Sequence, residues 1–261
     1  MSDIGDVGMT KEVAIVTGAT GGIGREFIRV LDKETLDEIW IIGRNKEQLT
    51  KIREQYGKKL IPICMDLTNA QDLQSIQTLL TENVRVSYLI NNAGMARMMP
   101  SKDFEAEEIA KTIQLNCNVP VTLINYCIPY MARGSKIINV SSASAFQPVP
   151  FINLYAATKA FEHSYSRALH MELKPAGITV TAVSPSWVDT DMLEKERNGR
   201  KIKFHGIVSP QRVAEKAIKD AKNGKDVSIC SFYVKCQHLN VKLIPHKLVM
   251  KIWMRGIKKY L

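Results

Sequence analysis

Short apolar runs, rich in β-branched residues, alternate along this chain with longer amphipathic stretches. Most of the runs are almost continuously apolar, as expected for strands of a parallel sheet that helices cover on both faces. The predicted strands span residues 13–17, 39–42, 60–64, 86–90, 136–140, 178–183 and 227–230. The predicted helices span residues 22–32, 45–56, 70–81, 103–131, 153–173 and 210–223. This order predicts right-handed crossovers and an α/β fold, with a doubly wound, seven-stranded parallel sheet in a single domain.

The composition is that of a globular protein and excludes several other classes. Of the 261 residues, 45% are hydrophobic and 24% are charged, which excludes a largely disordered chain. No apolar run approaches the roughly 18 residues of a membrane-spanning helix, and residues 1–10 are not expected to be a signal peptide. Five widely spaced cysteines predict reduced thiols in a cytoplasmic protein. Neither cysteines nor histidines have the spacing of a metal site, so no metal is expected.

The formal net charge of +10 is unevenly distributed. Residues 1–194 hold 19 Lys and Arg against 22 Asp and Glu, whereas residues 195–261 hold 17 against 4. The basic excess therefore belongs to the last quarter of the chain. A nucleic-acid binder is one interpretation of this charge. It is the weaker one, because the basic residues lack a recognisable nucleic-acid-binding motif, and no nucleic acid is expected.

A glycine-rich turn, Thr17-Gly-Ala-Thr-Gly-Gly-Ile-Gly24, follows the first predicted strand and precedes a helix. Glycine is favoured there because a Cβ would keep the backbone away from a pyrophosphate bound at the helix N-terminus. The spacing Gly18-x3-Gly22-x-Gly24 differs from the commoner G-x-G-x-x-G, and no Walker motif follows. A mere tight connection is the alternative, but the place between the first strand and the first helix predicts a dinucleotide site.

The end of the second predicted strand bears on the choice between the two nicotinamide cofactors. An NAD site usually has an acid about 20 residues beyond the glycines, but this chain has Arg44 there. A guanidinium suits a ribose 2′-phosphate, so NADP(H) is the predicted cofactor. NAD(H) stays open, because Gly21 stands where a second basic contact is usual.

Two further motifs complete a pattern. Asn91-Asn-Ala-Gly94 follows the fourth predicted strand, and Tyr155-Ala-Ala-Thr-Lys159 opens the helix after the fifth. Ser142 lies 13 residues before Tyr155. With the glycine-rich turn, these motifs closely resemble the short-chain dehydrogenase/reductase family over about residues 10–235. The resemblance implies a Rossmann fold and an oxidoreductase that interconverts carbonyls and alcohols.

The Tyr155 motif has a chemistry of its own. Tyr155 and Lys159 are four residues apart and project from the same side of a helix. A phenol with a pKa near 10 is a poor proton shuttle at neutral pH, and a nearby cation favours the phenolate, so the pair predicts general acid–base catalysis. The resemblance implies that Ser142 binds the substrate oxygen and that Lys159 also holds the nicotinamide ribose. It further implies that Asn116 supports a water chain to that lysine, with Asn118 as a competing candidate.

The same resemblance implies the other cofactor contacts. The predicted cofactor-binding residues are Gly18, Thr20, Gly22, Ile23, Gly24, Arg44, Asp66, Leu67, Asn92, Ala93, Gly94, Tyr155, Lys159, Pro185, Val188 and Thr190. Asp66 matches an acid that meets the adenine amine. Residues 185–190 match a loop that holds the carboxamide, although Ser186 and Trp187 depart from the usual sequence.

Substrate specificity is expected from residues 95–100, 143–151 and 192–207. Their apolar members predict a slot for a lipophilic ketone such as a steroid or an acyl compound, with ordinary loop packing as the alternative. The slot residues are Met98, Phe146, Pro148, Val149, Phe151 and Trp187. Residues 191–208 are basic and predict a lid over the substrate, and a solvated loop is the alternative.

Residues 238–261 form a basic C-terminal segment. From residue 246 onward, cations occupy one side of a predicted helix and apolar residues the other. This pattern favours peripheral membrane contact, and packing on its own domain or on a second subunit is the alternative. A homo-dimer or homo-tetramer through residues 103–131 and 153–173 is implied by the resemblance alone.

These features together predict an NADP(H)-dependent oxidoreductase that interconverts a small-molecule carbonyl and a secondary alcohol. One alternative is the same chemistry with NAD(H). Another is a catalytically silent dinucleotide-sensing or scaffold protein.

Overall fold

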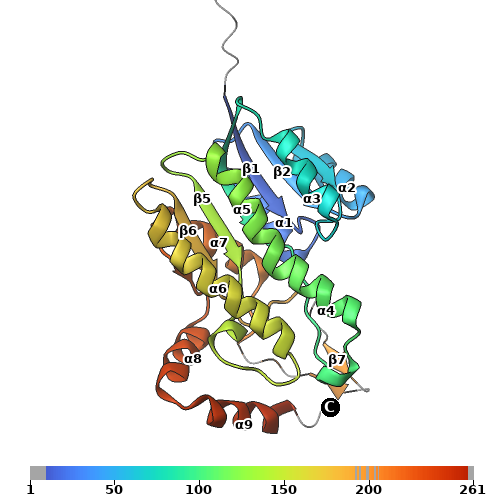
Figure 1. The fold of residues 1–261 in the computed structure, drawn as a ribbon, viewed down its shortest axis with the longest axis vertical. Helices are drawn as coiled ribbons and strands as arrows, with labels where there is room; N and C mark the ends of the chain where they lie inside the picture. The colour runs from blue at the N-terminus through green and yellow to red at the C-terminus, as the bar shows by residue number, and fades with distance from the viewer. Residues whose placement is uncertain are drawn as a thin grey trace, which may run out of the picture.

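The computed structural model describes residues 10–257, apart from 192, 194, 198, 199, 203 and 205. Its main sheet has seven strands in the order β3-β2-β1-β4-β5-β6-β9, and every neighbouring pair is parallel (Figure 1). The strands are β1 Lys11–Thr17, β2 Glu38–Gly43, β3 Leu60–Cys64, β4 Val84–Asn91, β5 Lys136–Val140, β6 Thr179–Val183 and β9 Val227–Ser228. The predicted α/β fold with one doubly wound parallel sheet is confirmed.

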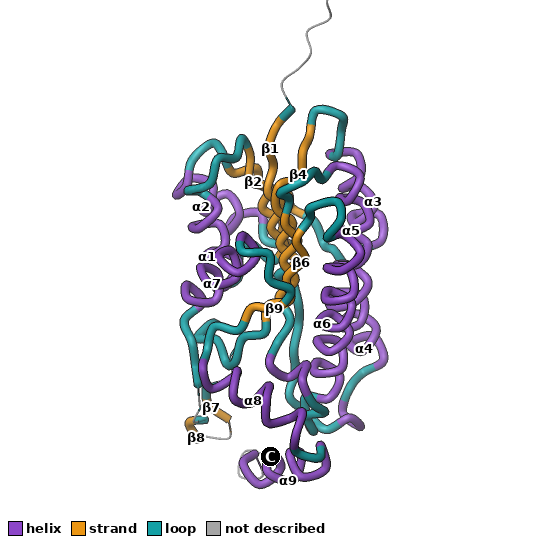
Figure 2. Tube along the Cα trace, turned by 90° about the vertical axis from the view of Figure 1, so that its left-hand side faces the viewer, coloured by secondary structure: helices purple, strands orange, loops and turns teal. Residues whose placement is uncertain are grey.

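Helices cover both faces of the sheet, as Figure 2 shows edge-on. One layer consists of α1 Gly22–Leu31, α2 Lys46–Tyr56 and α7 Pro210–Lys222. The other layer consists of α3 Ala70–Ser75, α4 Ala106–Ile113, α5 Val119–Cys127 and α6 Asn153–Leu173. The sheet is therefore buried on both sides, which explains why its strands are apolar without alternation.

Strand β1 shows how the two cores are built. Val13 and Ile15 belong to the hydrophobic cluster on one face, and Ala14 and Val16 to the cluster on the other. All four are fully buried, because successive side chains of a strand point to opposite faces. The carboxyl ends of the parallel strands consequently meet along one edge, where polar residues follow each apolar run.

The predicted helix over 103–131 is present as one uninterrupted helical element from Ala106 to Cys127, but it is not regular throughout. The regular α4 ends at Ile113, a π-helical turn runs over Gln114–Asn118, and α5 follows directly. Two causes act at the π-helical turn. The Asn116 side chain makes hydrogen bonds outside the helix, and Pro120 has no N–H to donate to the preceding turn. The predicted helix over 70–81 ends early, since a 3₁₀ turn replaces it at Ile76–Leu79.

The last strand is shorter than predicted, and a helix follows it that the sequence reasoning missed. This helix, α8 Phe232–Leu243, lies with α9 His246–Ile257 at one end of the molecule, beyond the carboxyl ends of the strands (Figures 1 and 2). The buried positions of α8, Val234 and Val241, lie seven residues apart. Because so few residues of α8 are buried, its sequence shows no clear amphipathic pattern.

The C-terminal helix α9 turns part of its apolar side toward the domain. The Trp253 indole N–H donates a 2.9 Å hydrogen bond to the carbonyl of Pro150, and Ile257 is buried. The sequence left open whether this helix contacts a membrane or packs on its own domain. Trp253 and Ile257 pack on the domain. Residues 258–261 of the predicted helix lie outside the described residues.

The predicted lid contains a short antiparallel pair, β7 Glu196–Arg197 with β8 Arg200–Lys201. Lys195 forms a 2.6 Å ion pair with Asp189 at its base. Part of the segment lies outside the described residues, and whether it moves as a lid stays a prediction. Among the described residues, no helix has the length and apolar character needed to cross a membrane.

Candidate active site

A cleft of about 600 Å³ runs along the edge where the strands end. Residues one or two positions after β1, β2, β3, β4, β5 and β6 line it, so the sheet topology gathers them. All the predicted catalytic and cofactor-binding residues line this cleft except Gly24 and Asn116, which lie behind its wall.

The glycine-rich turn between β1 and α1 is pressed against the turn after β4. Gly18 has a φ of +62°, and a Cβ on it would lie 2.9 Å from Cα of Ala93. A Cβ on Gly24 would lie only 2.3 Å from the carbonyl oxygen of Gly18. The Asn92 amide locks the two turns together by donating to the carbonyls of Thr17 and Gly18, at 3.0 and 3.1 Å.

The N-terminus of α1 faces the cleft without a side-chain cap. Gly21 occupies the cap position and has no side chain that could accept from the first N–H groups of the helix, and Gly21, Gly22 and Ile23 line the cleft. Backbone N–H groups at a helix N-terminus favour an anion. The turn therefore fits a pyrophosphate, and glycine keeps its backbone close to its neighbours, since a Cβ on Gly22 would lie 2.7 Å from Cγ2 of Thr190.

One end of the cleft is polar and charged. Arg44 is exposed at the end of β2, and Asp66 lies at the end of β3. Although burial acts to raise the pKa of Asp66, hydrogen bonds from the backbone and hydroxyl of Thr68 lower it overall, with help from the charges of Arg44 and Lys111. A stable carboxylate beside an exposed arginine can bind an amine and a phosphate side by side.

Ser142, Tyr155 and Lys159 all line the same cleft. Ser142 follows β5, and its Oγ accepts a 3.1 Å hydrogen bond from the N–H of Ser144. Tyr155 and Lys159 both come from the first turns of α6, and the lysine Nζ lies 5.9 Å from the centroid of the tyrosine ring. The structure thus brings together the three residues that the sequence predicted to act as a unit.

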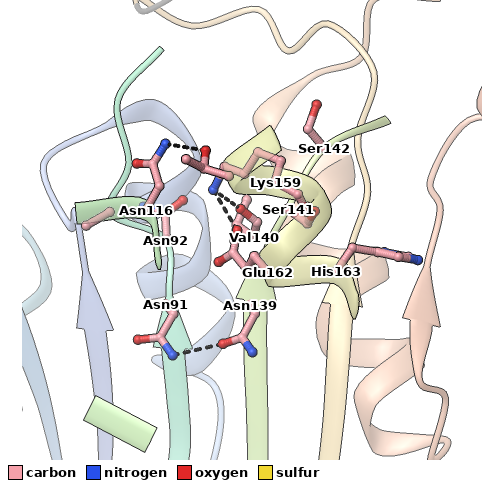
Figure 3. A network of polar contacts seen from close by, with 12 residues as sticks. Asn91, Asn92, Asn116, Asn139, Val140, Ser141, Ser142, Lys159, Glu162 and His163 are labelled. Carbon is pink, nitrogen blue, oxygen red and sulfur yellow. Dashed lines mark hydrogen bonds and ion pairs between the residues drawn. The ribbon is translucent and has the colours of Figure 1, made fainter. Parts of the chain in front are cut away.

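Lys159 is buried, and its ammonium is held from below (Figure 3). Its Nζ donates to the carbonyl of Val140 and to a carboxylate oxygen of Glu162, both at 2.7 Å. Burial on its own would lower the pKa of Lys159, but the charge of Glu162, aided by Tyr155, outweighs burial and raises it. Lys159 therefore stays a cation beneath the phenol.

Glu162 is the residue of this site that the sequence reasoning missed. It is as buried as its partner, and burial raises its pKa to about 6 against the opposing charge of Lys159. Its spacing, one turn beyond Lys159, was the available signal. An acid three residues from a lysine is common on solvated helix surfaces, so the pair was not informative without knowledge of burial.

Asn116 sits in the π-helical turn behind the cleft. Its amide donates to the carbonyl of Met95 at 2.9 Å and to the Thr158 hydroxyl at 3.0 Å, and its oxygen accepts from the N–H of Met95. A Cβ on Gly94 would lie 3.3 Å from that oxygen and 3.5 Å from Nζ of Lys159. Asn116 thus borders the lysine, whereas the competitor Asn118 bonds to Gln114 on its own turn.

A buried chain of polar groups links the strands below Lys159 to α6. The Asn91 amide donates to Asn139 at 2.8 Å, and the Asn139 amide donates to the hydroxyl of Ser166 at 2.8 Å. That hydroxyl donates in turn to the backbone carbonyl of Glu162. Figure 3 shows the Asn91–Asn139 bond directly beneath the lysine. The network fixes α6 against β4 and β5.

The other end of the cleft is apolar, but its composition differs from the predicted slot. Only Val149 and Trp187 of the six predicted residues line it. Phe146 instead packs on His163 and His238. The remaining wall includes Leu193, Tyr233, Gln237 and Trp253, and the rings of Trp187 and Trp253 stack at 6.3 Å. The residues from α8 and α9 were missed because no local pattern connects them with the distant motifs.

Among the residues that the structure describes, the cysteines and the potential metal ligands do not form another site. All five cysteines are free thiols. Within the described part of the chain, no three His, Cys, Asp or Glu side chains gather where they could hold a metal ion.

Comparison with known proteins gives the family. A family model described as short chain dehydrogenase matches residues 12–201, and the chain belongs to this family. The glycine-rich turn and the Asn92, Ser142 and Tyr155 segments all fall within the matched region.

Relatives and solved structures agree with this membership. A very-long-chain 3-oxoacyl-CoA reductase of Anas platyrhynchos is 34% identical over 69% of this chain, and the match spans only 60% of that relative's length. A Sphingobium yanoikuyae short-chain dehydrogenase in complex with NADPH is 26% identical, with a TM-score of 0.76 over 92% of this chain and 95% of the other. A Comamonas testosteroni alcohol dehydrogenase specific for bulky-bulky ketones is 26% identical, with a TM-score of 0.72 over 85% and 86%.

The buried Lys159–Glu162 pair predicts a pH-dependent effect on stability. Lys159→Met leaves Glu162 without its counter-charge, which raises the pKa of that carboxyl further. We expect a loss of about 3–5 kcal/mol in the free energy of unfolding at pH 8, where the carboxylate must be buried unpaired. At pH 5 protonation relieves this cost, so the loss should be clearly smaller. Urea unfolding at the two pH values measures both.

The double variant Lys159→Met/Glu162→Leu is the matched control, because it removes both charges. Its unfolding free energy should return close to that of the wild type at pH 8. Equal losses for Lys159→Met at pH 5 and pH 8 would contradict the role given to Glu162.

Proposed function

We propose that this chain is an NADP(H)-dependent oxidoreductase that interconverts a ketone and a secondary alcohol, with Tyr155 as general acid and base. The observation that carries the proposal is the convergence of Tyr155, Lys159 and Ser142 on one cleft whose floor is a glycine cradle. A catalytically silent protein would not need a buried cation beneath a phenol in that cleft.

The cleft fits a dinucleotide along its length. Gly18, Gly22 and the N-terminus of α1 would hold the pyrophosphate, and Asp66 the adenine amine. Arg44 would hold a 2′-phosphate in a charge-assisted contact, and the Sphingobium relative, which is a complex with NADPH, supports this choice. The loop of Pro185, Val188 and Thr190 would border the carboxamide. A bound nicotinamide would supply or accept the hydride.

The residues of the chain then handle the proton and the carbonyl. Ser142 directs its hydroxyl to the substrate oxygen and stabilises the charge that develops on it. Tyr155 gives its phenolic proton to that oxygen in the direction of reduction and takes it back in oxidation. Lys159 stabilises the phenolate by its positive charge, and Glu162 and the Val140 carbonyl keep the ammonium beneath the ring.

A lipophilic ketone or acyl compound is the proposed substrate class. Val149, Trp187 and Trp253 contribute apolar surface to the cleft. The names of two similar proteins, a very-long-chain 3-oxoacyl-CoA reductase and a dehydrogenase specific for bulky ketones, support this class.

The proposal includes two predictions, one about the oligomeric state and one about the location in the cell. Homo-oligomers through the α4–α6 layer stay a prediction, which the exposed side chains of Ile113 and Phe161 support. A cytoplasmic location also stays a prediction.

Tyr155→Phe should remove the proton donor and leave the rest of the cleft intact. We expect kcat for ketone reduction to fall by at least about 10²–10⁴-fold, with the Kd for NADPH unchanged within about twofold. Turnover and cofactor fluorescence titration measure the two effects. Tyr165→Phe is the matched control, because Tyr165 lies on the same helix but outside the cleft. A Tyr155→Phe enzyme with near-wild-type turnover would exclude the assigned role.

Arg44→Asp should reverse the cofactor preference. Loss of a charge-assisted contact, about 1.5–3 kcal/mol, raises the Kd for NADPH by about 10–100-fold, while the Kd for NADH should change little. Titration of both cofactors measures the ratio. The control is Arg53→Asp, which makes the same charge change at an exposed position of α2 outside the cleft. Equal weakening of both cofactors would mean that Arg44 does not read the 2′-phosphate.

A further inference from the structure

The helix α8 carries an apolar stripe on the side that faces water. Leu239 and Leu243 lie seven and eleven residues after Phe232. These spacings place the three side chains within a narrow arc of one helix face. Their exposed fractions are 79%, 60% and 76%. The opposite face already holds Val234 and Val241, which are buried against the domain. Packing within the domain therefore does not account for the outer stripe.

The next helix also carries exposed apolar residues. In α9, Leu248 and Ile252 lie one turn apart and are 49% and 57% exposed, while Trp253 and Ile257 face the domain. Both helices lie at the same end of the molecule (Figures 1 and 2). We call Phe232, Leu239, Leu243, Leu248 and Ile252 the outer apolar surface. Exposed large apolar residues grouped in this way mark an interaction site.

The charge around this surface has a single sign. After Asp226 the sequence contains no Asp or Glu, and it contains seven Lys and Arg. Lys235, Lys242, Lys247, Lys251 and Arg255 are all exposed on α8 and α9. The apolar residues are therefore interleaved with cations only.

We propose that the outer apolar surface docks this protein onto an anionic lipid membrane. Apolar side chains that enter the acyl region, with flanking lysines near the headgroups, are the pattern of a helix lying in the membrane interface. A protein–protein interface is the poorer match, because lysine is depleted from the centres of such interfaces. The contact differs from the one expected from the sequence, since the side of α9 that carries Trp253 and Ile257 faces inward.

The same two helices form part of the wall of the cleft. Tyr233 and Gln237 of α8 and Trp253 of α9 line its apolar end, so the docked surface is the outer side of that wall. Docking would place the cleft next to the membrane, and it requires no spanning helix.

Sedimentation of the full chain with vesicles tests the proposal without reference to enzyme activity. Wild type should bind vesicles of phosphatidylcholine and phosphatidylserine (7:3) more tightly than pure phosphatidylcholine vesicles. Leu239→Asp/Leu243→Asp should lower the partition coefficient at least about tenfold. Leu79→Asp is the control, because it makes one substitution of the same kind at an exposed leucine outside α8 and α9, and it should bind as wild type does.

A charge variant gives a second, independent arm that does not disturb packing. Lys242→Gln/Lys247→Gln/Lys251→Gln should lower binding to the anionic vesicles by about a hundredfold, at about fivefold per cation. The control Lys46→Gln/Lys51→Gln/Lys58→Gln removes the same charge from other exposed positions and should have little effect.

Three results would overturn the proposal. The first is no binding of wild type to either vesicle, and the second is binding that the Leu239→Asp/Leu243→Asp and the α8–α9 lysine variants leave unchanged. The third is a lipid-free oligomer, measured by light scattering, that Leu239→Asp/Leu243→Asp dissociates, because a second copy of the chain would then cover this surface. Thermal unfolding of each variant shows whether it is folded.

Discussion

The centre of this site depends on how one buried ammonium is held. Lys159 reaches from α6 to the Val140 carbonyl at the end of β5 and to Glu162 on its own helix. A buried cation without such partners would be strongly destabilising. Glu162 moves with the helix, so the Val140 carbonyl is the partner that restricts where α6 can pack. Ser141 reinforces the same point by donating its hydroxyl to the backbone carbonyl of Lys159. Tyr155 lies one turn earlier on the same helix, so these buried contacts of Lys159 also determine where Tyr155 lies.

A close approach of two backbones supplies the second constraint. The Thr17 hydroxyl accepts hydrogen bonds from the N–H groups of Asn92 and Ala93, both at 3.0 Å. Together with the Asn92 amide, these bonds hold the turn after β1 against the turn after β4 in a way that a side chain at Gly18 would prevent. The cradle for an anion is thus formed by protein contacts alone, so binding would not have to order it.

The sequence could predict those features that depend on residues close to one another in the chain, but not those that depend on tertiary contacts. The strands and most helices were predictable, because burial on both sheet faces leaves long apolar runs. Most site residues were predictable because they follow a strand or open a helix, as Ser142 and Tyr155 do. The π-helical turn was not, since the bonds of Asn116 to Met95 and Thr158 are tertiary. Glu162 was not, because an acid three residues beyond a lysine looks the same on a solvated helix and in a buried pair.

The two ends of the cleft come from different parts of the chain, and this division has a consequence. The cradle, Arg44, Ser142, Tyr155 and Lys159 lie within residues 12–201, the region that matches the family model. Tyr233, Gln237 and Trp253, which complete the apolar end, lie beyond it. Those three side chains are carried by helices outside the sheet, so their replacement would alter the shape offered to a substrate without moving the strands that place the catalytic groups. If the proposed function holds, we expect the strand ends to determine the chemistry and the C-terminal helices to shape part of the substrate end. This division explains why the sequence motifs could suggest a reaction but not the wall that Tyr233, Gln237 and Trp253 complete.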